Sequence, residues 1–181
     1  MFKPLTFILN FILLLAVQVL LLNDVVIRSA ITLKGIPLFI PLVYPLIILL
    51  LPVRIAPWLA LLLSLATGLV MDMFCNTPGM HAAASVLLGY TRIGLLNLFF
   101  QQNDKNLNDA VPTLFRMGFR SFVVYLLMAC TIHHLFFYTL QIWSWKQSPY
   151  ILLKTLVSVV MSVLLMVIIQ LLFARQSTRK S

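Results

Sequence analysis

Residues that could carry out enzymatic chemistry are few and scattered along this 181-residue sequence. There is no glutamate, and the four aspartates fall in separate segments, at Asp24, Asp72, Asp104 and Asp109. Metal-dependent phosphoryl transfer needs carboxylates gathered around the ion. Ser64 and His133 could in principle belong to a hydrolase, but no serine lies in a Gly-x-Ser-x-Gly motif. We therefore predict a non-enzymatic protein.

Two adjacent histidines, His133 and His134, could bind haem or a metal ion. Neighbouring residues on a helix point about 100° apart, so the two rings cannot easily share one ligand. The two cysteines, Cys75 and Cys130, offer neither a disulfide framework nor metal-ligand spacing. Polar packing between helices is the favoured use of the histidines, and we expect no cofactor or metal.

Asp72 and Arg92 draw attention because an ionised side chain is costly inside a membrane. They could form a ligand, proton or partner site. Asp72 lies only about one turn from a predicted helix end, so simple hydration at the interface explains it equally well. For Arg92, which lies deeper, a structural or interface role is favoured over snorkelling. The two residues should lie roughly 12 Å apart along the membrane normal, so His81 or Ser85 is the expected neighbour of Asp72.

Small and polar residues recur at four-residue spacing in two neighbouring predicted helices. They are Ala60, Ser64, Gly68 and Asp72 in the first helix, and His81, Ser85 and Gly89, followed by Arg92, in the second. Residues four apart share one helix face, and small side chains let helices approach closely in lipid. The pattern predicts a close hairpin with Pro78 and Gly79 in its turn. The same stripe is a candidate surface for packing or for binding a partner.

The elements that position these residues are predicted to be membrane helices. Of all residues 62% are hydrophobic and 9% are charged, against roughly 25% charged residues in soluble domains. A membrane helix needs about 20 apolar residues. The sequence predicts an all-α polytopic membrane protein, a single transmembrane domain over 1–181 with about six helices. The approximate spans are 5–22, 36–51, 57–74, 80–100, 121–143 and 151–174. The second should be kinked, because it contains Pro37, Pro41 and Pro45.

The net charge of +9 comes from basic residues dispersed between the apolar runs, which argues against a nucleic-acid partner. With the N-terminus inside, nine basic residues lie on the cytoplasmic side, and four lie outside, namely Arg28, Lys34, Lys146 and Lys154. This asymmetry predicts that both termini of the chain lie in the cytoplasm. We predict a multi-pass protein of the bacterial inner membrane, whose basic tail can also contact anionic lipid.

The region from residue 60 to residue 95 resembles the central signature of the rod shape-determining protein MreD family. The matching positions are Gly68, Asp72, Pro78, Gly79 and Arg92. Chain length, basic charge and the proline-rich second helix are similar as well. The resemblance implies a component of the cell-elongation machinery that binds MreC and couples the MreB cytoskeleton to peptidoglycan synthesis. It also implies that RodA and a class B penicillin-binding protein belong to the same assembly.

The family is also similar in architecture to the substrate-binding subunits of energy-coupling-factor transporters. That similarity leaves a second function open, in which the chain is the substrate-binding membrane subunit of a vitamin-type transporter. The buried polar groups of the predicted hairpin would then surround a small molecule. The residue pattern alone does not separate these two functions, since packing and binding both use small and polar side chains inside lipid.

Overall fold

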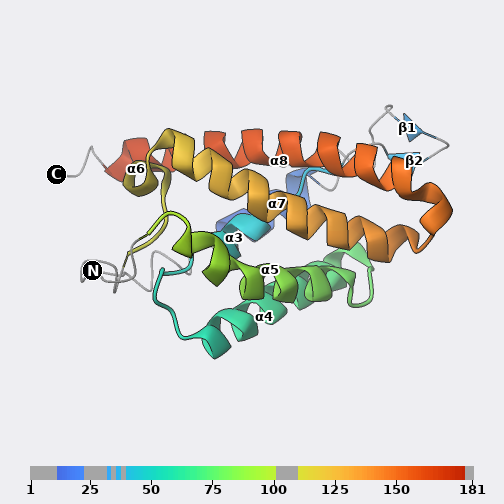
Figure 1. Ribbon diagram of the computed structural model, residues 1–181, viewed down its shortest axis with the longest axis horizontal. Coiled ribbons are helices and arrows are strands. Elements are labelled where there is room, and N and C mark those ends of the chain that lie inside the picture. The colour runs from blue at the N-terminus through green and yellow to red at the C-terminus, as the bar shows by residue number, and fades with distance from the viewer. Residues whose placement is uncertain (1–11, 23–31, 34–35, 38–39, 101–109, 178–181) are drawn as a thin grey trace.

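The computed structural model describes residues 12–22, 32–33, 36–37, 40–100 and 110–177. In these residues the chain is predominantly helical (Figure 1). The long helices are α4 (Pro57–Cys75), α5 (Met80–Asn97), α7 (Phe119–Ile142) and α8 (Ser148–Ser177). The short elements are η1 (Val17–Leu22), β1 (Thr32–Leu33), β2 (Ile36–Pro37), α3 (Pro45–Leu49), α6 (Leu114–Met117) and η3 (Trp145–Gln147).

Three of the described helices, α4, α7 and α8, are long and apolar enough to cross a membrane. They coincide with the spans predicted over 57–74, 121–143 and 151–174, so the chain has the character of a helical membrane protein. Helix α5 occupies the span predicted over 80–100, but it is more polar and does not meet the same test. Its polar residues His81, Ser85 and Arg92 are buried inside the protein. The described residues thus provide three such helices. Of the first predicted span, 5–22, residues 12–22 are helical, and residues 5–11 lie outside the described residues.

The region predicted as a kinked helix over 36–51 has a different structure. Its first residues form strand β2, which pairs antiparallel with β1. Residues 40–43 have no regular secondary structure, and only Pro45–Leu49 forms a helical turn, α3. Proline removes a backbone donor and its ring clashes with the preceding helical turn, so Pro41 and Pro45 together break the helix instead of bending it. Pro45 is tolerated because it occupies the first turn of α3.

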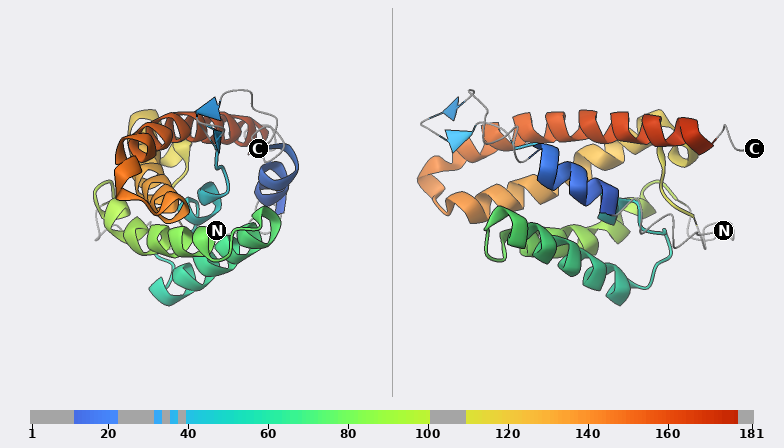
Figure 2. Two further views of the ribbon diagram at one scale, coloured as in Figure 1. Left: turned by 90° about the vertical axis from the view of Figure 1, so that its right-hand side faces the viewer. Right: turned by 180° about the vertical axis from the view of Figure 1, so that it is seen from behind.

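The long helices surround this irregular segment. Figure 2 shows residues 40–49 enclosed by the helices in the end-on view, and every residue of α3 is buried. Helix α7 packs against both α5 and α8, whereas α4 lies at the edge and packs mainly on α5. The α4–α5 and α7–α8 turns lie at one end of the bundle, and α6 and the end of α8 at the other (Figure 1).

Candidate functional site: a polar interface inside the bundle

The small-residue stripe predicted from the sequence forms the contact between α4 and α5. A Cβ atom at Gly68 would clash with the backbone of Ala82 and would lie 2.6 Å from the carbonyl oxygen of His81. A Cβ at Gly89 would instead clash with the side chain of Ser64, 3.0 Å from its Cβ. The predicted close hairpin is confirmed. Ala60, Ser64 and Gly68 are buried by α5, so this face is occupied within the chain itself.

Asp72 joins the end of α4 to the start of α5. Its carboxylate accepts hydrogen bonds from the backbone N–H groups of His81 and Ala82, each at 2.9 Å, and from the hydroxyl of Thr77 at 2.9 Å. A carboxylate is favourable at a helix N-terminus because it satisfies free N–H groups and opposes the positive end of the helix dipole. His81 is thus the neighbour of Asp72, as predicted. Because Asp72 is only 7% exposed, capping describes its environment better than free hydration.

The turn between α4 and α5 explains two further residues of the predicted signature. Asn76 ends α4 in the left-handed conformation, with φ of 53°, and Gly79 precedes α5 with φ of 79°. Glycine adopts positive φ without steric cost. Pro78, between them, cannot continue a helix from the preceding residue. Pro78 and Gly79 therefore shape the turn that brings the N–H groups of α5 to Asp72.

We expect Asp72→Ala to lower the free energy of unfolding by about 1.5–3 kcal/mol, because it removes the charged acceptor of three hydrogen bonds. Thr77→Ala removes one of these bonds and should cost about 1 kcal/mol. Reversible unfolding in mixed micelles would measure both values. Equal stabilities of Asp72→Ala and the wild-type protein would contradict the capping role.

Arg92 ties α5 to the segment that follows α3. Its Nη2 donates hydrogen bonds to the carbonyl oxygens of Leu51 and Pro52, the latter at 3.0 Å. The guanidinium is fully buried, so Arg92 does not snorkel toward the surface. Its Nε and Nη1 atoms have no hydrogen-bond partner among the residues described. Arg92 and Asp72 bind different groups, in agreement with their predicted separation, and Arg92 has a structural role in holding the chain at the end of α3.

Tyr44 connects the histidines of two helices. Its hydroxyl lies 3.0 Å from Nδ1 of His81 on α5 and 2.8 Å from Nε2 of His133 on α7. Ser85 of α5 donates to the same hydroxyl at 3.5 Å. His134 is 3.1 Å from the hydroxyl of Ser162 on α8. The two adjacent histidines thus bind groups on different segments, His133 the Tyr44 hydroxyl and His134 the Ser162 hydroxyl of α8, which is polar packing between helices of the predicted kind.

Two serines of α8 accept hydrogen bonds from backbone N–H groups of the irregular segment at residues 40–43. The N–H of Ile40 donates to Oγ of Ser158 at 3.1 Å, and that of Leu42 donates to Oγ of Ser162 at 2.9 Å. Alternate residues of an extended chain repeat every ~6.6 Å, and residues four apart on a helix every ~6 Å, so the two spacings match. Pro41 has no N–H to donate, and it falls between the two donors. Sequence reasoning overlooked this serine pair.

The side chain of Gln18 forms hydrogen bonds with the next backbone groups of the irregular segment, at residues 41–44. Its side-chain amide donates to the carbonyl oxygen of Pro41 at 3.2 Å. Its Oε1 accepts the N–H groups of Val43 at 2.6 Å and of Tyr44 at 3.3 Å. Backbone groups inside a membrane must find partners within the protein, and Gln18 provides three of them. Gln18, an amide inside the mostly apolar first predicted span, was the available signal in the sequence.

Lys154 is a buried cation near the end of the bundle where α7 meets α8. Its ammonium group donates to Oε1 of Gln141 at 3.1 Å and lies 4.7 Å from the centre of the Tyr138 ring. The Tyr138 hydroxyl in turn donates to Ser158 at 2.7 Å. The lysine stem therefore packs between α7 and α8 while its charge is compensated by an amide oxygen and an aromatic face.

The polar interface formed by Gln18, Tyr44, Asp72, His81, His133, His134, Ser158 and Ser162 is suited to fixing helices against one another. Its hydroxyls and ring nitrogens are mostly paired with other protein groups rather than directed into an open cavity. No group of three or more potential metal ligands occurs in the part of the chain that is described. Together the fold and the interface define a small helical membrane protein with a polar interior. Comparisons with known protein families, curated proteins and solved structures gave no match.

Proposed function

We propose that the protein is a non-enzymatic inner-membrane component of the bacterial cell-elongation machinery, which binds MreC and couples the MreB cytoskeleton to peptidoglycan synthesis. One observation supports this proposal most directly. Four of the five residues that resemble the MreD signature build the α4–α5 hairpin: Gly68 permits the close approach, Asp72 caps α5, and Pro78 and Gly79 form the turn. These residues keep the hairpin rigid. A rigid hairpin suits a scaffold protein, which presents such a unit to other proteins.

The partner surface follows from which face of the hairpin is free. The small-residue stripe is buried against α5, so it cannot also bind a partner. The opposite face of α4 is apolar and exposed, at Trp58, Leu62, Leu69 and Met73. Because α4 lies at the edge of the bundle (Figure 2), another membrane helix can pack along it without displacing a described helix. We assign contact with MreC to this face.

Co-purification tests the cellular role. Solubilised membranes of rod-shaped cells that produce a tagged form of the chain should yield MreC together with RodA and the class B penicillin-binding protein. Depletion of the chain should turn the rods into round cells. Absence of all three proteins from the purified sample, together with normal shape after depletion, would overturn the proposal.

Photocrosslinking tests the assigned surface. A photoreactive residue placed at Leu62 or Leu69 should form an adduct with MreC, because both side chains point away from α5. The matched control positions are Leu156 and Leu164, which are at least as exposed but belong to α8. We expect clear MreC adducts from α4 and none from α8. Adducts of equal yield from both helices would contradict a specific surface on α4. They would not contradict the cellular role, which the co-purification tests separately.

A second candidate function, a substrate-binding subunit of a transporter, is favoured by the irregular segment at residues 40–44. Interrupted helices near the bilayer midplane often bind substrates in transporters. Here, however, the backbone donors of Ile40, Leu42, Val43 and Tyr44 already bind protein side chains. This candidate predicts a co-purifying small molecule, a thermal shift on its addition and dependence on an ATPase partner. Mass spectrometry of the purified protein distinguishes it from a scaffold.

A further inference from the structure

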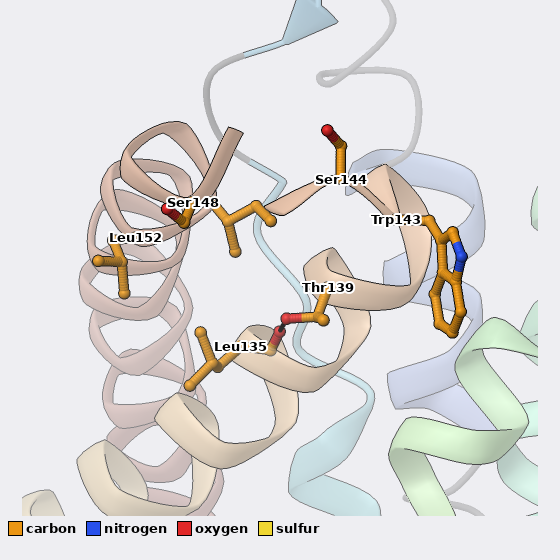
Figure 3. A pocket seen from close by; sticks show the side chains of 7 residues that line it. Leu135, Thr139, Trp143, Ser144, Ser148 and Leu152 are labelled. Carbon is orange, nitrogen blue, oxygen red and sulfur yellow. Dashed lines mark hydrogen bonds between the residues drawn. The ribbon is translucent and has the colours of Figure 1, made fainter. Parts of the chain in front are cut away.

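The α7–α8 turn contains a pocket that the proposed function does not use. It encloses about 370 Å³ between the end of α7 and the start of α8, within the range of about 300–1,000 Å³ that is typical of small-ligand pockets (Figure 3). Its lining consists of Leu135, Thr139, Trp143, Ser144, Ser148, Ile151 and Leu152. The hydroxyl of Thr139 already donates to the carbonyl oxygen of Leu135 at 2.7 Å. The pocket thus has an apolar body, with serines at the turn.

The position of the pocket determines which molecules can reach it. Its walls belong to two helices that can span a membrane, α7 and α8, and it lies at their shared end. Trp143, which lines it, is 78% exposed, and tryptophan is enriched where membrane meets water. An apolar opening at the end of two such helices is placed where lipid would border it. The volume accommodates part of one acyl chain rather than a whole lipid.

The charge of the turn selects the type of headgroup. Lys146 lies in η3, between the lining residues Ser144 and Ser148, and its side chain is exposed. No acidic residue occurs between Leu135 and Leu152. Helix α8 begins at Ser148, so the positive end of its dipole lies at this turn, next to Lys146. The count of basic residues places this turn on the outer side of the membrane. The positive-inside rule therefore does not account for Lys146, which leaves it available for binding an anionic headgroup.

From this combination of cavity, exposed lysine and helix start we infer that the α7–α8 turn is a binding site for an anionic phospholipid. One acyl chain occupies the pocket between Thr139 and Ile151. The phosphate lies at the N-terminus of α8 beside Lys146. Such a lipid would fill the space between the two helix ends and hold the turn at the membrane surface.

Lipid photolabelling tests this inference on the full-length protein in nanodiscs. The two probes are phosphatidylglycerol and phosphatidylcholine, each with a photoreactive group in one acyl chain. Peptide mass spectrometry should locate the phosphatidylglycerol label between Leu135 and Leu152. Thr139→Phe should abolish this label, because the new ring fills the pocket. Lys146→Glu should lower it at least about fivefold and leave phosphatidylcholine labelling unchanged, since the loss of one basic residue alone costs roughly 1 kcal/mol in binding of anionic lipid.

Two control variants separate the site from general effects. Thr131 lies two turns earlier on α7 and donates to Leu127 as Thr139 donates to Leu135, but it does not line the pocket. Thr131→Phe should therefore leave labelling unchanged. Arg120→Glu changes the charge at the other end of the bundle and should also have no effect on this label. Equal labelling by both lipids, unchanged labelling of Thr139→Phe, or a protein crosslinked at this turn in place of lipid would each overturn the inference.

Discussion

Gly68→Ala is expected to lower the free energy of unfolding by about 2–3 kcal/mol, although it adds a single methyl group. The added Cβ would meet backbone atoms of Ala82 and the carbonyl oxygen of His81, and backbone atoms cannot rotate away as a side chain can. Relief would require α4 and α5 to separate, which would also move Asp72 from the N–H groups that it caps. Gly68→Leu should prevent the hairpin from closing.

Gly94→Ala is the matched control, because Gly94 lies on α5 and a Cβ there would meet nothing within 4 Å. Its stability should equal that of the wild type or exceed it by up to about 1 kcal/mol, as alanine favours helix over glycine. Unfolding in mixed micelles measures both variants, and a cysteine pair across α4 and α5 reports the helix separation. Equal stability of Gly68→Ala and Gly94→Ala would contradict the close contact.

The hairpin could be predicted from the sequence because its determinants are local. Gly68 and Gly89 recur with other small residues at helical spacing, and the partners of Asp72 lie within ten positions of it. A turn near Pro78 then brings the two faces together without any information from the rest of the chain. The sequence left open whether these residues pack within the chain or bind a partner. The structure places Ser64 and Gly68 against α5, and leaves the outer face of α4 for other contacts.

The interior of the bundle could not be predicted in the same way. Tyr44 binds His133, which is 89 positions away, and Leu42 binds Ser162, which is 120 positions away. No periodicity within one helix specifies such a pairing, since it depends on how separate helices are arranged. The prolines of the second predicted span indicated a weakened helix, but whether it bends or breaks depends on partners for the freed N–H groups. Ser158 and Gln18, on two other segments, supply those partners.

Gln18→Leu is expected to have the largest effect of any single polar substitution, because it leaves the N–H groups of Val43 and Tyr44 without acceptors. Each unpaired donor away from water costs about 1–3 kcal/mol, so the free energy of unfolding should fall by at least about 3 kcal/mol. The loss should exceed that for Asp72→Ala, since water can reach a helix end more easily than the centre of the bundle. Amide hydrogen exchange at Val43 and Tyr44 should accelerate together with the loss of stability.

Gln170→Leu provides the control for this experiment. Gln170 is 8% exposed, and its side chain has no backbone partner among the hydrogen bonds of the described residues. The same exchange of an amide for an apolar group should therefore change the stability by less than about 1 kcal/mol. A small effect at Gln170 and a large one at Gln18 would show that the Gln18 side chain stabilises the protein through its hydrogen bonds to the irregular backbone, and not through the volume that it fills. If Gln18→Leu preserved both the stability and the slow exchange at Val43, the backbone at 40–44 would have to be satisfied by other groups, and the polar interface would not depend on Gln18.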